Sequence, residues 1–78
     1  MELLQITQTV DARGLSCPMP IVKTAQAAKS LPSGALIEVL ATDAGSVKDF
    51  AAWCRTTGNG LVESSSDGTD YRFVIRSK

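Results

Sequence analysis

Turn-forming residues divide this chain into short segments, and this division constrains the fold more than any other feature of the sequence. Proline, glycine, asparagine and aspartate recur at residues 11–16, 32–34, 58–60 and 66–69. The apolar residues between these breaks follow either the period of a strand or the period of a helix. At 78 residues the chain is near the size at which one core becomes marginal, so we expect a single domain over residues 1–78.

The first half of the chain predicts a strand, a helix and a second strand. Residues 6–10 alternate apolar and polar side chains and are rich in β-branched residues, which favours a half-buried strand. Residues 18–31 predict an amphipathic helix that ends at the proline-glycine break. Its apolar positions are Ile21, Ala25 and Ala28. Residues 35–41 form a short apolar run, which is typical of an interior strand.

The second half predicts another helix and then a hairpin. Asp43 and Ser46 are both plausible N-caps of the helix, and residues 46–49 resemble a capping box with aspartate in the fourth place. The core-facing stripe of this helix is Val47, Phe50, Ala51 and Cys54. Residues 61–65 and 70–76 flank an Asp-Gly pair, which is a strong hairpin signal.

This order of segments, β-α-β-α-β-β, restricts the possible topologies. Two strands joined by a helix run parallel through a right-handed crossover, whereas a hairpin joins antiparallel strands. We therefore expect an α/β fold of the α+β two-layer sandwich type, with a four-stranded mixed sheet. Both helices should cover one face of the sheet and leave the other face partly solvated.

The Cys17-Pro18-Met19-Pro20 motif places a thiol where the first helix should begin. Proline is favoured at the first helical position, so Pro18 marks the start of the helix and Cys17 its N-cap, with Pro20 still in the first turn. Free amides and the helix dipole stabilise an anion at this place. We therefore expect the Cys17 thiolate to form readily, at the rim of the sheet where a strand ends.

Composition excludes several other kinds of chemistry. The chain has no histidine and two cysteines, without a Cys-x-x-Cys pair, so it lacks the usual base, a four-ligand zinc set and a dithiol redox pair. Eight basic and eight acidic residues give no basic field for nucleic acid or an anionic membrane. Residues 1–5 lack a signal-like pattern, and we expect a cytoplasmic protein without metal, cofactor or membrane insertion.

A specific motif then suggests a family. The pattern is Asp11-x-x-Gly14-Leu15-x-Cys17-Pro18-x-Pro20, followed by Thr42-Asp43, Asp49 and the pair Trp53-Cys54. It resembles the TusA/SirA-type sulfur-carrier family from about the first strand to the last. Members of this family more often have proline after the aspartate that matches Asp43. This chain has Ala44 there, so the start of its second helix is less sharply fixed.

The resemblance implies that Cys17 carries a persulfide between partner proteins, in a single TusA-like domain over residues 1–78. We expect a sulfurtransferase-type persulfide carrier rather than a self-contained enzyme, because the chain has no histidine base and its partners would have to lower most of the barrier. The implied donors are a cysteine desulfurase, a rhodanese or another sulfurtransferase, and the implied acceptors are another sulfur carrier or a sulfur-using enzyme. The pathways left open are tRNA thiolation, molybdenum-cofactor assembly, sulfur oxidation and thiosulfate utilisation, the last through contact with a membrane thiosulfate transporter.

The residues around Cys17 admit structural and functional interpretations. The residues expected to support Cys17 are Pro18, Pro20, Gly14, Asp11 and Arg13. The candidates for a docking surface are Met19, Asp43, Lys48 and Asp49. Arg13 could help to stabilise a Cys17 anion or could be an ordinary solvated arginine of the loop. Trp53 could fill the core or contact a partner, whereas Cys54 is expected to pack in the core.

A different class of function remains open, namely a non-catalytic regulatory or RNA-associated interaction module. Two-layer α/β sandwiches also occur in such proteins, so the fold alone does not exclude this alternative. The balanced charge and the lack of a basic, aromatic surface pattern count against nucleic acid. Sulfur loading of Cys17 separates the two hypotheses.

Overall fold

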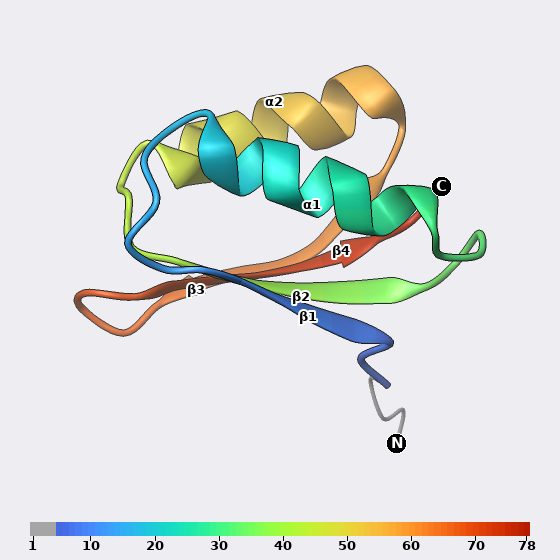
Figure 1. Cartoon of the computed structure of the whole chain (residues 1–78), viewed down its shortest axis with the longest axis horizontal. Coiled ribbons are helices and arrows are strands. Elements are labelled where there is room, and N and C mark those ends of the chain that lie inside the picture. Colours follow the sequence, from blue (N-terminus) through green and yellow to red (C-terminus); the bar gives the residue numbers. More distant parts are fainter. Residues whose placement is uncertain (1–4) are drawn as a thin grey trace.

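A computed structural model describes residues 5–78 of the chain as a sheet covered on one face by two helices (Figure 1). The prediction that residues 1–5 carry no signal-like pattern concerns a segment that lies almost entirely outside the described residues. The elements are β1 (Gln8–Ala12), α1 (Met19–Lys29), β2 (Leu36–Ala41), α2 (Ser46–Thr57), β3 (Gly60–Ser66) and β4 (Tyr71–Arg76). The predicted order and the two-layer sandwich are confirmed. Neither helix of the described part is long and apolar enough to cross a membrane.

The sheet has the strand order β1-β2-β4-β3, so β2 and β4 are central. β1 runs parallel to β2, and β4 is antiparallel to both β2 and β3, as the crossover and hairpin signals predicted. β1 begins two residues later than expected and continues to Ala12. The reason is its pairing with β2, which runs in unbroken register from Gln8 opposite Ile37 to Ala12 opposite Ala41.

The core lies between the sheet and the two helices. Phe50 of α2 stacks on Phe73 of β4 with ring centroids 4.7 Å apart, and Trp53 meets the Phe50 ring edge-on at 6.2 Å. Cys54, 4% exposed, belongs to the same cluster, which confirms its predicted place in the core. Trp53 is half-buried and packs against this cluster, so of its two predicted roles the structure shows the one in the core.

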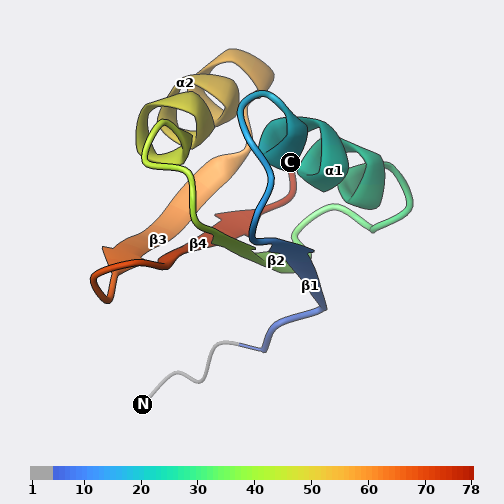
Figure 2. The same ribbon diagram turned by 60° about the vertical axis from the view of Figure 1, so that its left-hand side comes forward.

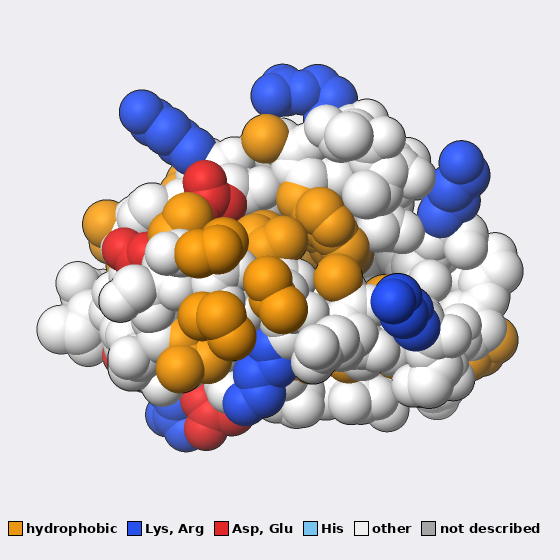
Figure 3. Space-filling model, turned by 45° about the horizontal axis from the view of Figure 1, so that its top comes forward, with side chains coloured by type: hydrophobic (Ala, Val, Ile, Leu, Met, Phe, Trp, Pro, Cys, Tyr) orange, Lys and Arg blue, Asp and Glu red, His pale blue; other side chains and the backbone are white. Residues whose placement is uncertain are grey.

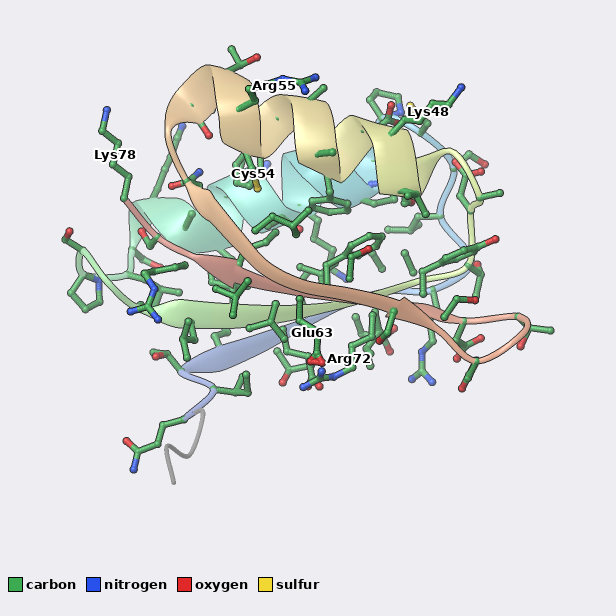
Figure 4. All side chains as sticks on the ribbon, turned by 180° about the vertical axis from the view of Figure 1, so that it is seen from behind. Lys48, Cys54, Arg55, Glu63, Arg72 and Lys78 are labelled. Carbon is green, nitrogen blue, oxygen red and sulfur yellow. The ribbon has the colours of Figure 1, made fainter. Side chains whose placement is uncertain are left out.

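The face of the sheet opposite the helices carries a polar network (Figure 4). Arg72 Nε donates to Glu38 Oε2 at 2.6 Å and its second nitrogen reaches Glu63 Oε2 at 2.8 Å. The Thr9 hydroxyl donates to Glu38 Oε1 at 2.9 Å. Charged and hydroxyl groups thus cover this face, as expected for a sheet with one solvated side.

The expected apolar stripe of α1 is confirmed in part, because Ile21 and Ala28 pack against the core, but the most buried residues of this helix are others. Pro20 and Thr24 are fully buried, whereas Ile21, Ala25 and Ala28 are only half-buried. Thr24 can be buried because its hydroxyl donates to the Pro20 carbonyl at 2.8 Å, which satisfies its polar group inside the helix. The sequence pattern counted this threonine as polar and so left the most buried position of the helix out of the predicted face.

The predicted start of α2 is wrong in two respects. The N-cap is Gly45, Ser46 is the first helical residue, and neither forms a side-chain capping bond. Ser46 is instead buried, and its hydroxyl has no hydrogen-bond partner among the described residues. Val47 is 42% exposed and does not belong to the core stripe. The end of the helix is as predicted, because Gly58 adopts a left-handed conformation with φ 86°.

Candidate functional site

Two loops meet at the end of the sheet where β1 and β2 finish. One loop joins β1 to α1 and contains the cysteine-proline motif, and the other joins β2 to α2 (Figure 2). Gly14 N of the first loop donates to Thr42 Oγ1 of the second at 2.9 Å. Gly14 has φ 83°, a conformation that glycine adopts without strain. The first loop is therefore fixed against the second before it reaches Cys17.

The second contact between these loops involves Cys17 itself. Its backbone N–H donates to Asp43 Oδ2 at 2.9 Å, and the other oxygen of Asp43 accepts from Gly45 N at 3.3 Å. The sequence suggested that Asp43 is the N-cap of α2, but Gly45 occupies that position. Asp43 joins the backbone before α1 to the turn before α2 and fixes the position of the cysteine.

The thiol of Cys17 is exposed and lies against the first turn of α2. Its Sγ donates to Asp49 Oδ2 at a distance of 2.6 Å. Asp49 was a candidate for docking only, and its contact with the thiol was missed. No local pattern could have found it, because the two residues are 32 positions apart in the sequence.

The helix begins one residue later than the motif predicted. Val22 N donates to the Pro18 carbonyl at 3.1 Å, so Pro18 is the N-cap, Met19 is the first helical residue and Pro20 is the second. The peptide bond between Cys17 and Pro18 is cis. The prediction that Cys17 is the N-cap is therefore wrong, whereas the place of Pro20 in the first turn is confirmed.

The electrostatic surroundings of the thiol also differ from those expected. The hydrogen bond to Asp49 raises the pKa of Cys17, and partial loss of solvent and the negative charges of Asp49 and Asp43 raise it further. The expectation of a readily formed thiolate is wrong for the protein as it stands. The sulfur lies one residue outside the helix end, and the charges that act on it are two carboxylates rather than a cation.

Arg13 and Asp11 form a separate pair at the base of the loop. Arg13 Nε donates to Asp11 Oδ1 at 2.9 Å, and a second guanidinium nitrogen lies 3.9 Å from Asp70 Oδ2. The side-chain and backbone hydrogen bonds from Arg13 lower the pKa of Asp11 to about 2. Lys23 of α1 donates to the Asp11 carbonyl at 2.7 Å. Of the two interpretations of Arg13, the structure favours a loop arginine that binds Asp11.

The two helices that follow the site loops both carry exposed apolar side chains. The most exposed large apolar side chains of the two helices are Met19 at 47%, Val47 at 42% and Val22 at 38%. Figure 3, in which the helix side is turned forward, shows apolar side chains gathered over the helices. Lys48 extends from α2 into solvent, whereas Cys54 points from the same helix toward the core (Figure 4). Val22 and Val47 were not expected here, since Val47 was assigned to the core.

No group of three or more side chains that could hold a metal ion occurs in residues 5–78. The described part of the site therefore consists of one exposed thiol, the Asp49 carboxylate that accepts from it, the Asp43 carboxylate that accepts from the Cys17 backbone N–H, and exposed apolar side chains on the two helices. Such a site can form and break a bond at its exposed sulfur.

Comparisons with known proteins identify similar sequences. The sequence model described as Sulfurtransferase TusA matches residues 8–77. The sulfur carrier protein TusA of Allochromatium vinosum is 45% identical over 69 residues, which are 88% of this chain and 91% of the relative. The putative sulfur carrier protein YrkI of Bacillus subtilis is 44% identical over 69 residues, 88% of this chain and 92% of the relative.

A solved structure supports the fold. The SirA-like protein from Desulfitobacterium hafniense superposes with a TM-score of 0.79 over 91% of this chain and 97% of its own. At 23% sequence identity this likeness concerns the fold alone. The two-layer sandwich is therefore shared with a protein whose sequence is quite different.

Proposed function

The chain belongs to the TusA family of sulfur carriers, and we propose that it carries sulfur as a persulfide on Cys17. The observation that supports this most directly is the position of the thiol. Cys17 is exposed on a loop fixed by Asp43, where the sulfur of another protein can reach it, whereas Cys54 is buried in the core. Transfer between proteins requires access to the carrier's sulfur, and of the two thiols Cys17 has it.

Loading would proceed by thiol exchange. The Cys17 thiolate attacks the outer sulfur of a cysteine persulfide on the donor, a new S–S bond forms at Cys17, and the donor's S–S bond breaks. The electron pair of the broken bond leaves with the donor's cysteine as its thiolate. The transferred atom keeps its oxidation level, so the step needs neither an oxidant nor a reductant.

Delivery is the same reaction in the other direction. A nucleophile on the acceptor attacks the outer sulfur, and Cys17 leaves as a thiolate that takes up a proton. Asp43 keeps the cysteine backbone in place during both steps. Pro18 and Pro20 lie at the start of α1, so the sulfur of Cys17 is presented just before the N-terminus of this helix. We place this chemistry in the cytoplasm and within one domain formed by residues 1–78.

The partners would dock on the surface around the thiol. We propose a cysteine desulfurase, a rhodanese or another sulfurtransferase as donor, and a second carrier or a sulfur-using enzyme as acceptor. The exposed Met19, Val22 and Val47 supply apolar contact area, and Asp43, Lys48 and Asp49 supply the charged rim. The product pathway, from tRNA thiolation to molybdenum-cofactor assembly, sulfur oxidation or thiosulfate utilisation, depends on the acceptor.

Intact-mass measurement tests the proposal. After incubation with a cysteine desulfurase and cysteine, or with a rhodanese and thiosulfate, we expect the wild type to gain one sulfur atom. Cys17→Ser should gain none, and Cys54→Ala is the matched control that should load like the wild type. A wild type that stays unmodified with both donors contradicts the proposal and leaves the non-catalytic interaction module as the better hypothesis.

A further inference from the structure

The contact between Cys17 and Asp49 suggests how the thiol is controlled. We propose that Asp49 is a positioning residue that holds Cys17 in its protonated form against α2, so that a donor must release this contact before the sulfur can attack. The identity of the sulfur donor in this inference rests on the proposed function. The contact itself can be tested without any sulfur donor.

The contact requires one hydrogen between the two side chains, and in this structure the Cys17 thiol donates it. A thiol has a single hydrogen to donate, and an ionised carboxylate can only accept. At 2.6 Å between Cys17 Sγ and Asp49 Oδ2 the hydrogen must lie between the two atoms. If the thiol loses this hydrogen, two negative charges face each other at contact distance, which is strongly unfavourable on a partly desolvated surface.

A second carboxylate acts in the same direction. Asp43, from the loop between β2 and α2, accepts the backbone N–H of Cys17 at 2.9 Å, and its charge opposes ionisation of the sulfur. The pKa of Cys17 is accordingly raised, with the hydrogen bond to Asp49 as the largest cause. Two negative charges, one from the loop and one from the helix, therefore oppose ionisation of the thiol.

The cations closest in sequence are directed elsewhere. Arg13, from the loop between β1 and α1, binds Asp11, and Lys23 of α1 binds the Asp11 carbonyl. Lys48, the neighbour of Asp49 in α2, extends away from the protein (Figure 4). None of these three is among the groups that shift the pKa of Cys17. The free carrier therefore keeps its nucleophile in the slow, protonated form.

Sulfur loading would itself remove the contact. In a persulfide the Cys17 sulfur is bonded to its Cβ and to the outer sulfur, and it has no hydrogen left to donate. The hydrogen bond from Cys17 to Asp49, which joins the loop before α1 to the first turn of α2, then exists only in the unloaded protein. Asp49 would thus make the loaded and unloaded surfaces different at the place where partners dock.

The pH dependence of alkylation tests this proposal. The rate at which iodoacetamide modifies Cys17 is followed over a pH series by the mass of the peptide that contains it, because the thiolate is the reacting form. In Asp49→Asn the rate profile should move to lower pH, with a several-fold faster reaction near neutral pH. Asp49→Glu, which keeps the carboxylate, should resemble the wild type.

Two controls complete the experiment. Asp67→Asn removes the same charge from the β3–β4 turn and should leave the profile unchanged. Circular dichroism establishes that each variant is folded. A folded Asp49→Asn with the wild-type profile overturns the proposal, and so does an equal shift in Asp67→Asn.

The two proposals fail independently. If the wild type accepts sulfur but Asp49→Asn leaves the alkylation profile unchanged, the positioning role is wrong and the carrier function stands. If Asp49→Asn shifts the profile but no donor loads the wild type, the control of the thiol by Asp49 is supported and the carrier function is contradicted.

Discussion

Cys17 and Cys54 both have a raised thiol pKa, but the physical causes differ. For Cys54 the cause is burial, and for Cys17 it is first of all the hydrogen bond to Asp49. A docking protein can displace a hydrogen bond or neutralise a carboxylate at the surface. It cannot expose a side chain in the core without unfolding the domain. An unreactive thiol can therefore be either permanently inert or inert only until a partner arrives.

One helix supplies both environments. The first turn of α2 carries Asp49, which contacts Cys17, and its second half carries Cys54, which packs in the core. Phe50, fully buried on Phe73, lies between them in the sequence and holds the helix on the sheet. The same packing that buries one cysteine thus presents a carboxylate to the other.

The largest difference should appear in native-state labelling. Cys17 should react with an alkylating reagent in the folded protein, whereas Cys54 should react only after unfolding and be slower by orders of magnitude. The measurement is a time course of alkylation for each cysteine peptide, in buffer and in urea. Similar rates for both cysteines in buffer would contradict the comparison.

Phe50→Ala should remove the protection of Cys54. Truncation of a fully buried phenylalanine costs about 3–5 kcal/mol of unfolding free energy, a large share of the stability of a small domain. Urea unfolding measures the loss, and Cys54 labelling should accelerate in parallel. Should this variant not fold, Phe50→Leu gives a smaller loss of the same sign. Unchanged Cys54 labelling in a destabilised variant would argue that Cys54 is shielded by something other than the core.

Cys54→Ala should weaken the core without affecting the site. Removing one buried sulfur leaves a small cavity and costs about 1 kcal/mol. Urea unfolding should show this loss, while sulfur loading of Cys17 should be the same as in the wild type. A variant of normal stability that fails to load would show that Cys54 takes part in the chemistry.

The smallest effect is expected in the alkaline stability of the protein. A thiol with a raised pKa in the folded state contributes stability that is fully present below its ordinary value of 9.0 and is lost as the pH rises through the raised value. Unfolding free energy should therefore fall above pH 9.0. Cys54→Ala and Asp49→Asn should each flatten this slope, and an unchanged slope in both would contradict the assigned causes.

Much of the fold could be predicted because its signals are local. The Asp-Gly pair marked the hairpin of β3 and β4, Gly58 marked the end of α2, and helical spacing placed Phe50 and Cys54 in the core. Val47 was misplaced because the rotation of α2 about its axis is set by contacts with the sheet. Spacing gives the width of an apolar stripe but not the edge that remains exposed.

The site was less predictable because its contacts join distant residues. The motif identified Cys17 but gave the wrong start of α1, since the first helical hydrogen bond goes to the Pro18 carbonyl. The thiol's surroundings were then inferred from a helix end that it does not occupy. Asp43 accepts from the backbone N–H of Cys17 and Asp49 accepts from its thiol. These aspartates come from the loop before α2 and from α2 itself, and only the folded protein brings them to Cys17.

The central claim is that Cys17, and not Cys54, carries the sulfur. The most direct test is to treat the wild type with a cysteine desulfurase and cysteine, block free thiols and persulfides, and locate the added sulfur by the mass of each cysteine peptide. We predict an added sulfur atom on the peptide that contains Cys17 and none on the peptide that contains Cys54. Sulfur found on Cys54, or on neither peptide, would contradict the claim.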